Sequence, residues 1–442
     1  GEEKIYDLVF MLANAQLNPT QLDHIRQVLS TLNEQEKLSL LSISLANQAL
    51  VLLNQHHKKY FPEVKLPYTG QQVKFLEEVH NANQARLEKT QQLLTNFEDK
   101  KLKLVLLKGT LFSHLIYKNP YYKKMNDLDL LLNREKEVEG IECLKELNYQ
   151  SIGDIFDDFD IGGDSHHTPP FISHDLKCIT GLHWELNSKY SNFKIDHSEI
   201  FQNIEPVNID GINAWRMSWE DNLLHLCVHL PFYKTGLREL ADVSNLINSP
   251  SVTFSWTKFA AIVKSQNLAD PVYRVLSLAQ AMIHFEIPAE FMNYLFKNAR
   301  KHTVKDTLNR LSNTQLLITS RCTHIAKIEK YFVVFKLATK FSEKLGALLK
   351  MYQLWFFPAA QDMRKIIGVL TINSPIYYII YRVKVPFLIW MAMARDHGNI
   401  PLAIVTLQNF LIGLREILFF PFKRNGISLK EHRFYKLLKA LE

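Results

Sequence analysis

Residues 103–132, KLVLLKGTLFSHLIYKNPYYKKMNDLDLLL, contain the pattern that decides the fold. They begin with an apolar run, Leu104–Leu107, which has the length of a short buried strand. Lys108-Gly109-Thr110 follows as a turn in which backbone can approach a ligand closely, and a helix is expected over Leu111–Tyr117. A second apolar strand is predicted over Leu128–Leu132, with two acidic residues at its head.

These acidic residues, Asp127 and Asp129, are two positions apart. Side chains at i and i+2 of a strand point to the same side, so the two carboxylates are expected to project together. Carboxylates held side by side repel each other unless a cation lies between them. Magnesium takes oxygen ligands and usually also holds substrate phosphates, and two such ions can stabilise an in-line phosphoryl displacement. The spacing therefore indicates metal-dependent phosphate chemistry.

The stretch resembles a known family. LLKG followed by KKMNDLDLLL is similar to the bacterial "uncharacterised nucleotidyltransferase" family of the polymerase-beta-type nucleotidyltransferase superfamily. Members typically show an LKG turn, an arginine four residues before the DxD pair, and a later strand that ends in His-Trp. Here Lys123 stands at the arginine position, which implies different phosphate binding. His183-Trp184, in LKCITGLHWEL, matches the later strand.

The resemblance implies transfer of a nucleoside monophosphate from an NTP, with ATP the expected donor, to an acceptor with release of pyrophosphate. Asp127 and Asp129 would hold Mg²⁺ or Mn²⁺. The backbone amides of Gly109 and Thr110 would cradle the phosphates, and Lys108 and Lys123 would neutralise charge as pyrophosphate leaves. The acceptor is not specified, although a small molecule or a peptide is favoured over nucleic acid, because no basic, aromatic motif accompanies the site.

The predicted third strand, Leu176–Leu186, departs from the family pattern. Members usually have an acidic residue two positions before the His-Trp histidine, where this chain has Gly181. Glu185 follows His183 by two residues and is the candidate third carboxylate, catalytic and metal-binding; the alternative is a solvent-facing strand end. His183 is a further candidate metal ligand or phosphate donor, or a packed strand histidine.

The predicted fold is α+β and predominantly helical, with a small mixed nucleotidyltransferase sheet between N-terminal and C-terminal helical regions. Periodicity predicts one buried helix over Leu38–Leu53 with Asn33 as its cap, and a long helix over Gln71–Lys101. Four regions are expected: an N-terminal helical region over 1–100, an α/β core over 101–200, a helical bundle over 201–345, and a basic, aromatic-rich helical region over 346–442.

Histidine and arginine positions after residue 200 allow two interpretations each. His225 and His229 are one helical turn apart, which suits a metal ligand pair, although structural histidines are favoured. Arg238 lies four residues before Asp242, where the family has a similar pair. An intrahelical ion pair is favoured there, and the alternative is that Arg238 faces the nucleotide phosphates.

Composition places the protein among ordinary globular proteins, because 47% of the 442 residues are hydrophobic and 22% are charged. Four scattered cysteines indicate a reducing compartment, and the N-terminal residues show no signal peptide, so a cytoplasmic location is expected. Residues 154–175 are expected to form a long loop near the site. The net charge is +7, and residues 350–442 contain 13 Lys and Arg against 5 Asp and Glu. This region allows weak contact with a membrane surface, although a solvated basic face is favoured.

Two other functions remain open at this stage. Gly181 is also compatible with a catalytically impaired nucleotide-binding or peptide-binding protein on the same fold, accessory to natural-product or polysaccharide biosynthesis, as the setting of relatives implies. A membrane-surface scaffold would depend on the C-terminal region alone.

Overall fold

The structure is a computed structural model that describes residues 2–125, 127–151, 166–187, 193, 195–230, 236–312, 341–356, 376 and 379–381. The chain divides into two compact units. The larger contains all described residues up to 312, and the smaller contains the described residues from 341 onward, including helix α17 (Phe341–Phe356). Most of the predicted C-terminal region, including the apolar segment 401–422, lies outside the described residues. None of the described helices is long and apolar enough to cross a membrane.

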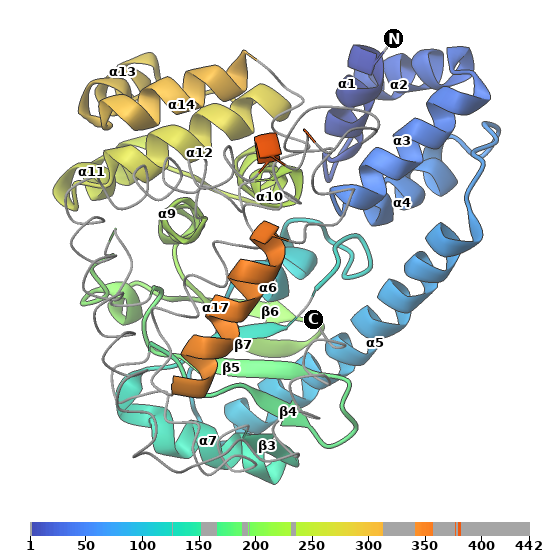
Figure 1. Cartoon of the computed structure of the whole chain (residues 1–442). Helices are drawn as coiled ribbons and strands as arrows, with labels where there is room; N and C mark the ends of the chain where they lie inside the picture. Colours follow the sequence, from blue (N-terminus) through green and yellow to red (C-terminus); the bar gives the residue numbers. More distant parts are fainter. Residues whose placement is uncertain are drawn as a thin grey trace. The chain divides into compact units, whose positions relative to one another are not determined.

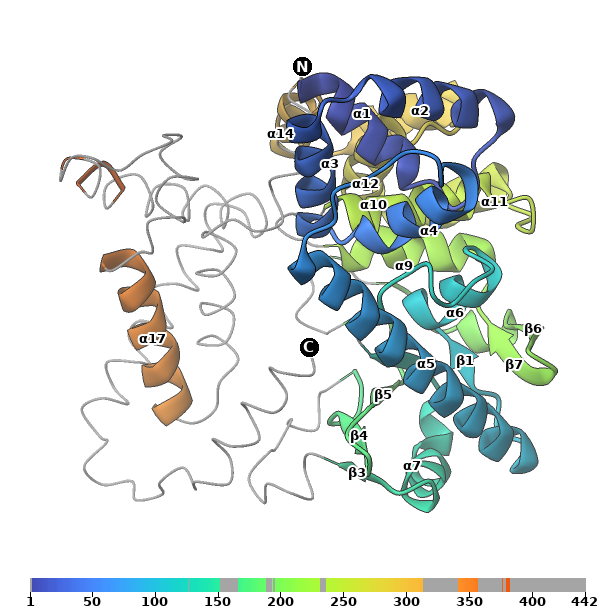
Figure 2. The same cartoon turned by 90° about the vertical axis from the view of Figure 1, so that its right-hand side faces the viewer.

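The fold is α+β and predominantly helical, as predicted, around one mixed sheet of seven strands (Figures 1 and 2). The strand order is β3-β4-β5-β2-β1-β7-β6, in which β1 pairs antiparallel with β2 and parallel with β7, and β2 pairs parallel with β5. The strands are β1 (Val105–Leu106), β2 (Leu128–Leu131), β3 (Tyr149–Ser151), β4 (Phe171–Ser173), β5 (Ile179–His183), β6 (Glu205–Ile209) and β7 (Ile212–Arg216).

Helices precede, interrupt and follow these strands. Before the sheet come α1 (Glu2–Leu12), α2 (Pro19–Thr31), α3 (Glu34–Ala46), α4 (Leu50–Tyr60) and α5 (Gly70–Asp99). Between strands lie α6 (Lys108–Leu115), η1 (Arg134–Lys136), α7 (Glu137–Glu146) and η2 (Ile200–Gln202). After the sheet come α9 (Trp219–His229), α10 (Leu237–Asn248), α11 (Trp256–Ser265), α12 (Ala269–Met282), α13 (Ala289–Asn298) and α14 (Lys301–Leu311).

Local sequence signals account for the helix starts in the first 100 residues. Asn18, Asn33 and Thr69 each form a reciprocal capping box, at α2, α3 and α5, which confirms the predicted cap at Asn33. The single helix predicted over residues 38–53 is wrong, because α3 ends at Ala46 and α4 starts at Leu50. Gln48 between them has a left-handed φ of 56°, which breaks the helical path.

The long helix α5 confirms the prediction for residues 71–101 and links the N-terminal helices to the sheet. It runs about 45 Å at 1.5 Å per residue, passing beside the sheet to α7 (Figure 2). Helix α7 approaches the sheet closely at Gly140, where an added Cβ would lie 2.4 Å from Leu132 Cδ2, 3.0 Å from Leu182 Cδ1 and 3.8 Å from Phe97 of α5. The buried leucines of β2 and β5 therefore face α5 and α7.

The sheet is larger than the sequence patterns indicated. Residues 205–216, expected to be helical, form the hairpin β6-β7, whose partly exposed strands lack a clean apolar alternation. Residues 171–173, expected to be loop, form β4 between β3 and β5. Residues 154–165 of that predicted loop lie outside the described residues.

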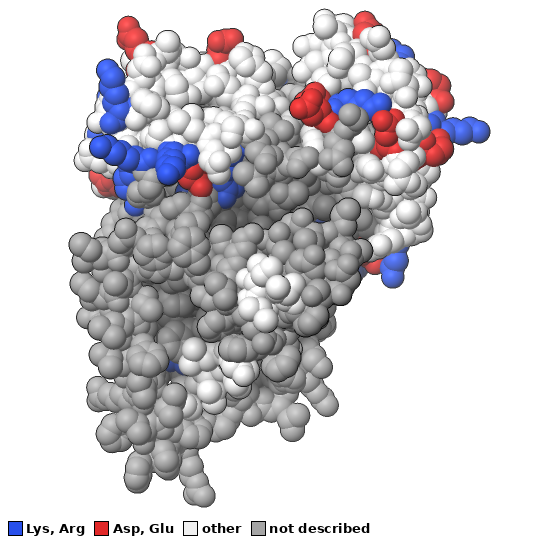
Figure 3. Space-filling model, turned by 45° about the horizontal axis from the view of Figure 1, so that its top comes forward, with Lys and Arg blue, Asp and Glu red and all other residues white. Residues whose placement is uncertain are grey.

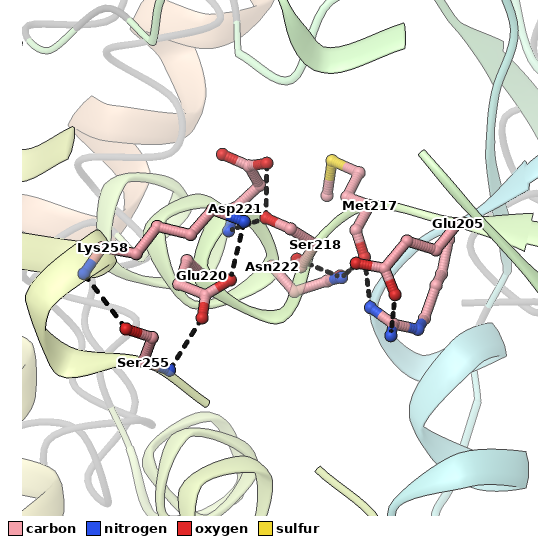
Figure 4. Close-up of polar contacts among 9 residues, drawn as sticks. Glu205, Met217, Ser218, Glu220, Asp221, Asn222, Ser255 and Lys258 are labelled. Carbon is pink, nitrogen blue, oxygen red and sulfur yellow. Dashed lines mark hydrogen bonds and ion pairs between the residues drawn. The ribbon is translucent and has the colours of Figure 1, made fainter. Parts of the chain in front are cut away.

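Polar contacts hold the start of α9, the helix that follows the β6-β7 hairpin. Ser218 caps it, with its Oγ accepting from the Asp221 amide at 3.1 Å. Glu220, which is buried, accepts from the Ser255 amide at 2.8 Å and pairs with Lys258 Nζ at 3.3 Å, which joins α9 to α11 (Figure 4). Since both ends of this connection are hydrogen-bonded, α9 is fixed relative to its neighbours.

Charges of both signs lie close together on the described upper face. Lys and Arg side chains stand beside Asp and Glu side chains in small groups over the helices (Figure 3). This mixture is consistent with the sequence, in which the excess of positive charge falls after residue 350.

The buried His56 of α4 makes folding stability dependent on pH. Its ring Nε2 lies 2.7 Å from the carbonyl oxygen of Asn14, and burial lowers its pKa from 6.5 to about 4. The unfolded chain therefore binds more protons between these values, so stability falls as pH drops from 6.5 toward 4, by about 3 kcal/mol from this group.

We expect His56→Gln, whose side-chain amide can still donate to the Asn14 carbonyl oxygen, to lose less stability on acidification than the wild type. The measurement is the free energy of unfolding from urea titrations at pH 7 and at pH 4.5. His24→Gln, at an exposed position of α2, is the control and should lose stability as the wild type does. Parallel curves for wild type and His56→Gln would contradict the assignment.

Candidate functional site

The head of β2 forms the centre of the candidate site. Leu128 and Leu130 are buried in the core, whereas Asp129 between them lies on the other face, so the predicted two-residue alternation is confirmed. Asp127 directly precedes the strand. The charge of Asp129 is close enough to raise the pKa of Asp127. The structure therefore brings the two predicted carboxylates together.

Asp129 is half-buried and contacts two other predicted residues. Its Oδ2 lies 3.0 Å from Lys108 Nζ, and its Oδ1 lies 3.1 Å from His183 Nε2. Burial alone would raise the pKa of Asp129, but the Lys108 charge and the His183 hydrogen bond outweigh it and hold the pKa well below its usual value. Asp129 is thus an anion at neutral pH.

Asp127 behaves differently. Part of the residue is exposed, yet removal of its carboxyl group from water and repulsion by Asp129 raise its pKa to about 6. Lys108, His183 and Arg238 act against this rise, which places these three side chains near Asp127. Two neighbouring acids with divergent pKa values are the arrangement that an added cation would stabilise.

The turn after β1 is the start of α6, which begins at Lys108 in place of the predicted Leu111. Leu107 at the N-cap provides no side-chain hydrogen bond, and Lys108 adopts a left-handed φ of 44°. The first amides of the helix, at Lys108, Gly109 and Thr110, therefore lack a side-chain cap and suit an anion. Thr110 is buried as a whole residue, whereas Lys108 and Gly109 are partly exposed, so the accessible part of this helix start is at Lys108 and Gly109.

Lys123 lies directly under this turn. Its Cε would be 3.5 Å from a Cβ at Gly109, and its Nζ lies 2.7 and 2.5 Å from the two carboxylate oxygens of Asp242. The Tyr117 hydroxyl donates to Asp242 Oδ1 at 2.7 Å. Both charged residues are buried, and burial lowers the pKa of Lys123 while Asp242 opposes this effect. Neutralisation of phosphate by Lys123 would require this ion pair to open.

Asp242 therefore pairs with Lys123. The prediction that favoured an Arg238–Asp242 ion pair is wrong, because no such pair is found among the described residues. The backbone of α10 allowed that pair, but the buried ammonium of Lys123 is the closer partner. Arg238 Nη1 instead donates to Gln48 Oε1, at the break between α3 and α4. Since its charge also lowers the pKa of Asp127, Arg238 lies on the side of the acidic pair.

Asn83 of α5 holds the segment that leads into the site, a role that the sequence did not indicate. It is fully buried and donates to the carbonyl oxygens of Pro120 at 3.0 Å and Lys123 at 2.8 Å. Its Oδ1 accepts from the Met125 amide at 3.3 Å. A polar residue on a long polar helix gives no signal of such a contact, because its partners are about 40 residues away.

The described contacts do not bring Glu185, the predicted third carboxylate, beside Asp127 and Asp129. In the parallel register of β2 and β5, Asp129 lies opposite Gly181. Glu185 lies beyond the end of β5, and its negative charge acts on His197. Within the described parts of the chain, no three His, Cys, Asp or Glu side chains are arranged to hold a metal ion.

Imidazoles surround Asp129, and most were not predicted as site residues. The backbone at His167 forms an antiparallel bridge with His183, and the His166, His167 and His183 rings lie 4.3–5.7 Å apart. From α9, His225 is buried and its ring centroid lies 5.5 Å from that of His229. Burial, then the Lys108 charge, holds the pKa of His225 well below its usual value. The prediction that His225 and His229 lie close together is confirmed, and His225 is near enough to Lys108 to be affected by its charge.

A mixed sheet, an uncapped helix start after its first strand and an acidic pair on the neighbouring strand are the features expected of a nucleotidyltransferase. A family model described as uncharacterised nucleotidyltransferase matches residues 33–284, more than half of the chain, and the chain belongs to this family. Comparisons with curated proteins and with solved structures find no match.

The Lys123–Asp242 pair offers a test of how the site is held. We expect Asp242→Ala to lower the unfolding free energy by about 3–5 kcal/mol, because it leaves a buried ammonium without its anion. Lys123→Met/Asp242→Asn, which removes both charges, should recover most of this loss in chemical denaturation.

The control for this comparison is Glu139→Ala, which breaks the exposed Lys136–Glu139 pair and should leave the unfolding free energy nearly unchanged. A double variant no more stable than Asp242→Ala would refute the role of the buried pair.

Proposed function

We propose that the protein transfers a nucleoside monophosphate, with ATP as the expected donor, to an acceptor and releases pyrophosphate. The observation that supports this most is the contact of Lys108, at the start of α6, with Asp129 at the head of β2. This contact brings the start of a helix, which suits an anion, and the Lys108 ammonium next to the acidic pair. Family membership supports the general class of reaction, and the donor and the acceptor are part of the proposal.

The phosphates would bind at the start of α6. The uncapped amides of Gly109 and Thr110 and the positive end of the helix dipole suit the β- and γ-phosphates. Lys108 would move between Asp129 and the phosphate oxygens, a short displacement for a flexible side chain. Arg238, held by Gln48 near Asp127, is the second cation we assign to the phosphates.

Asp127 and Asp129 would hold Mg²⁺ or Mn²⁺. The fit is to an ion shared with the nucleotide, because magnesium is usually bound through one or two carboxylates plus substrate phosphates. The pKa of Asp127 is raised by burial and by repulsion from Asp129, and the pKa of Asp129 is lowered by Lys108 and His183, and such a pair is consistent with an ion of this kind. When bound, it would withdraw charge from the α-phosphate and the leaving pyrophosphate.

Lys123 has a supporting role in this proposal. Since its ammonium pairs with Asp242 and its stem lies under Gly109, it would fix the phosphate-binding turn. Glu185 stays a predicted third ligand that the described geometry does not support.

A second function, a nucleotide-binding protein without turnover, is favoured by one observation. Gly181 stands opposite Asp129 where relatives are expected to have an acid. Release of pyrophosphate separates the two functions, whereas nucleotide binding does not.

Calorimetry should detect Mg²⁺-dependent binding of ATP by the wild type, and we expect Asp127→Ala/Asp129→Ala to lose this binding. Pyrophosphate release, measured in the same samples with cell extract as the acceptor source, should fall about 100-fold or more, as for the removal of a main charge-stabilising group. The fold should persist, since Asp127 and Asp129 lie outside the apolar core.

Asp23→Ala, which removes an exposed carboxylate of α2, is the matched control and should bind as the wild type does. ATP binding that survives unchanged in the double variant would exclude this site.

A further inference from the structure

A cleft lies between α4 and α5, in a part of the chain to which the proposed function assigns no role. Its volume is about 650 Å³, which is within the range of small-molecule sites. The lining residues come from α4, from α5 and from the segment between them, together with Tyr121 of the segment before β2, and the structure describes all of them. A hollow of this size with helices as walls can receive a small ligand.

Asn54 of α4 is a buried polar residue of this cleft. It lines the cleft although only 6% of the residue is exposed. Within the described residues, its side-chain carboxamide forms no hydrogen bond. Buried amides in folded proteins are nearly always hydrogen-bonded. Water can satisfy such a group, and a ligand that offers the same hydrogen bonds can displace the water. Since the accessible part of Asn54 opens onto the cleft, a ligand in the cleft is the partner that fits it.

The chemistry of a carboxamide restricts what that ligand can be. It offers an acceptor oxygen beside a donor nitrogen, and it pairs best with an edge that has a donor next to an acceptor, as asparagine does with adenine. The walls of the cleft are the continuous helices α4 and α5, whose backbone groups are already paired within each helix. An extended peptide would find few main-chain partners there, so a flat group with one polar edge is favoured.

The remaining lining supplies contacts for a flat ring. Val51, Val73 and Leu76 are apolar, and Val73 is 43% exposed although its side chain is aliphatic. Tyr121 lies in the same lining and stacks on His80, with ring centroids 4.4 Å apart and ring planes 20° apart. Aromatic side chains of this kind stack on the faces of nucleobases.

The cleft also adjoins the segment that leads into the candidate site. Tyr121 lies between Pro120 and Lys123, whose carbonyl oxygens accept from Asn83 Nδ2 at 3.0 and 2.8 Å. The Lys123 side chain in turn lies under the turn at Gly109. A ligand that contacts Tyr121 therefore touches the same segment that supports the phosphate-binding turn.

We propose that the cleft between α4 and α5 binds a nucleobase, whose edge pairs with the Asn54 carboxamide and whose ring lies against the apolar and aromatic lining. The base can belong to the donor nucleotide or to a separate nucleoside, and the chemistry of recognition is the same for both. This inference goes beyond the proposed function, because it stands on the cleft and requires no transfer reaction.

The test is calorimetric titration of the full chain with adenosine, guanosine, cytidine and uridine, in the absence of ATP. We expect adenosine to bind, and purine riboside, which keeps the ring but lacks the amino donor, to bind about tenfold more weakly. Absence of binding by all four nucleosides would overturn the inference. It would leave the proposed function standing, because that function is tested by ATP binding and pyrophosphate release.

Two variants connect binding to the cleft. Asn54→Leu, which keeps the size of the side chain, should weaken adenosine binding about tenfold or more, without a loss of unfolding free energy, because no hydrogen bond within the described structure is broken. Val73→Trp, at a partly exposed position, should fill the cleft and weaken binding while Asn54 stays in place. Gln35→Leu, which removes an exposed amide of α3 outside the cleft, is the control. Unchanged adenosine affinity in both cleft variants would overturn the inference.

Titration of adenosine into protein saturated with ATP and Mg²⁺ separates the two sources of the base. Loss of adenosine binding, together with weaker ATP binding by Asn54→Leu, would support the cleft as the site of the donor's base. Adenosine binding that persists in the presence of ATP, and is weakened by Asn54→Leu, would support a site for a separate nucleoside.

Discussion

The buried ion pair between Lys123 and Asp242 joins the parts of the larger unit on which the candidate site depends. It fastens the segment before β2 to α10, and the Tyr117 hydroxyl shares the same carboxylate. Asn245, one turn further along α10, donates to Tyr117 and to the Ala13 carbonyl oxygen and so reaches the N-terminal helices. Since a buried charge is tolerated only when it is paired, the network has a single satisfactory arrangement.

Electrostatic balance at the head of β2 explains why so many basic groups converge there. Two carboxylates close together repel each other, and the structure offsets this with Lys108 in direct contact and Arg238 nearby. Burial, with a smaller contribution from the Lys108 charge, lowers the pKa values of the nearby His166 and His225. The positive charges nearest the acidic pair are at the ends of long side chains, which can adjust without movement of the backbone.

Sequence patterns failed where tertiary contacts override local preference. The helix predicted across residues 38–53 is interrupted at Gln48, whose side chain accepts a hydrogen bond from Arg238, 190 residues later. The hairpin β6-β7 and strand β4 are short and only partly apolar, so their assignment depends on pairing with distant strands. His167 lies in a stretch that resembled a loop, and its bridge to His183 makes it part of the site.

The sequence by itself determined β1, the helix after it and β2 with its acidic pair, because a strand alternation of two residues and a glycine turn are local properties. It also determined the family, through the LKG and DxD motifs. Only the tertiary structure decided that Lys123 pairs with Asp242 and that Arg238 is held by Gln48. The physical reason is distance along the chain: the partners of Asp129 and Lys123 are 54 and 119 residues away, and burial and charge choose among such partners only when the chain has folded.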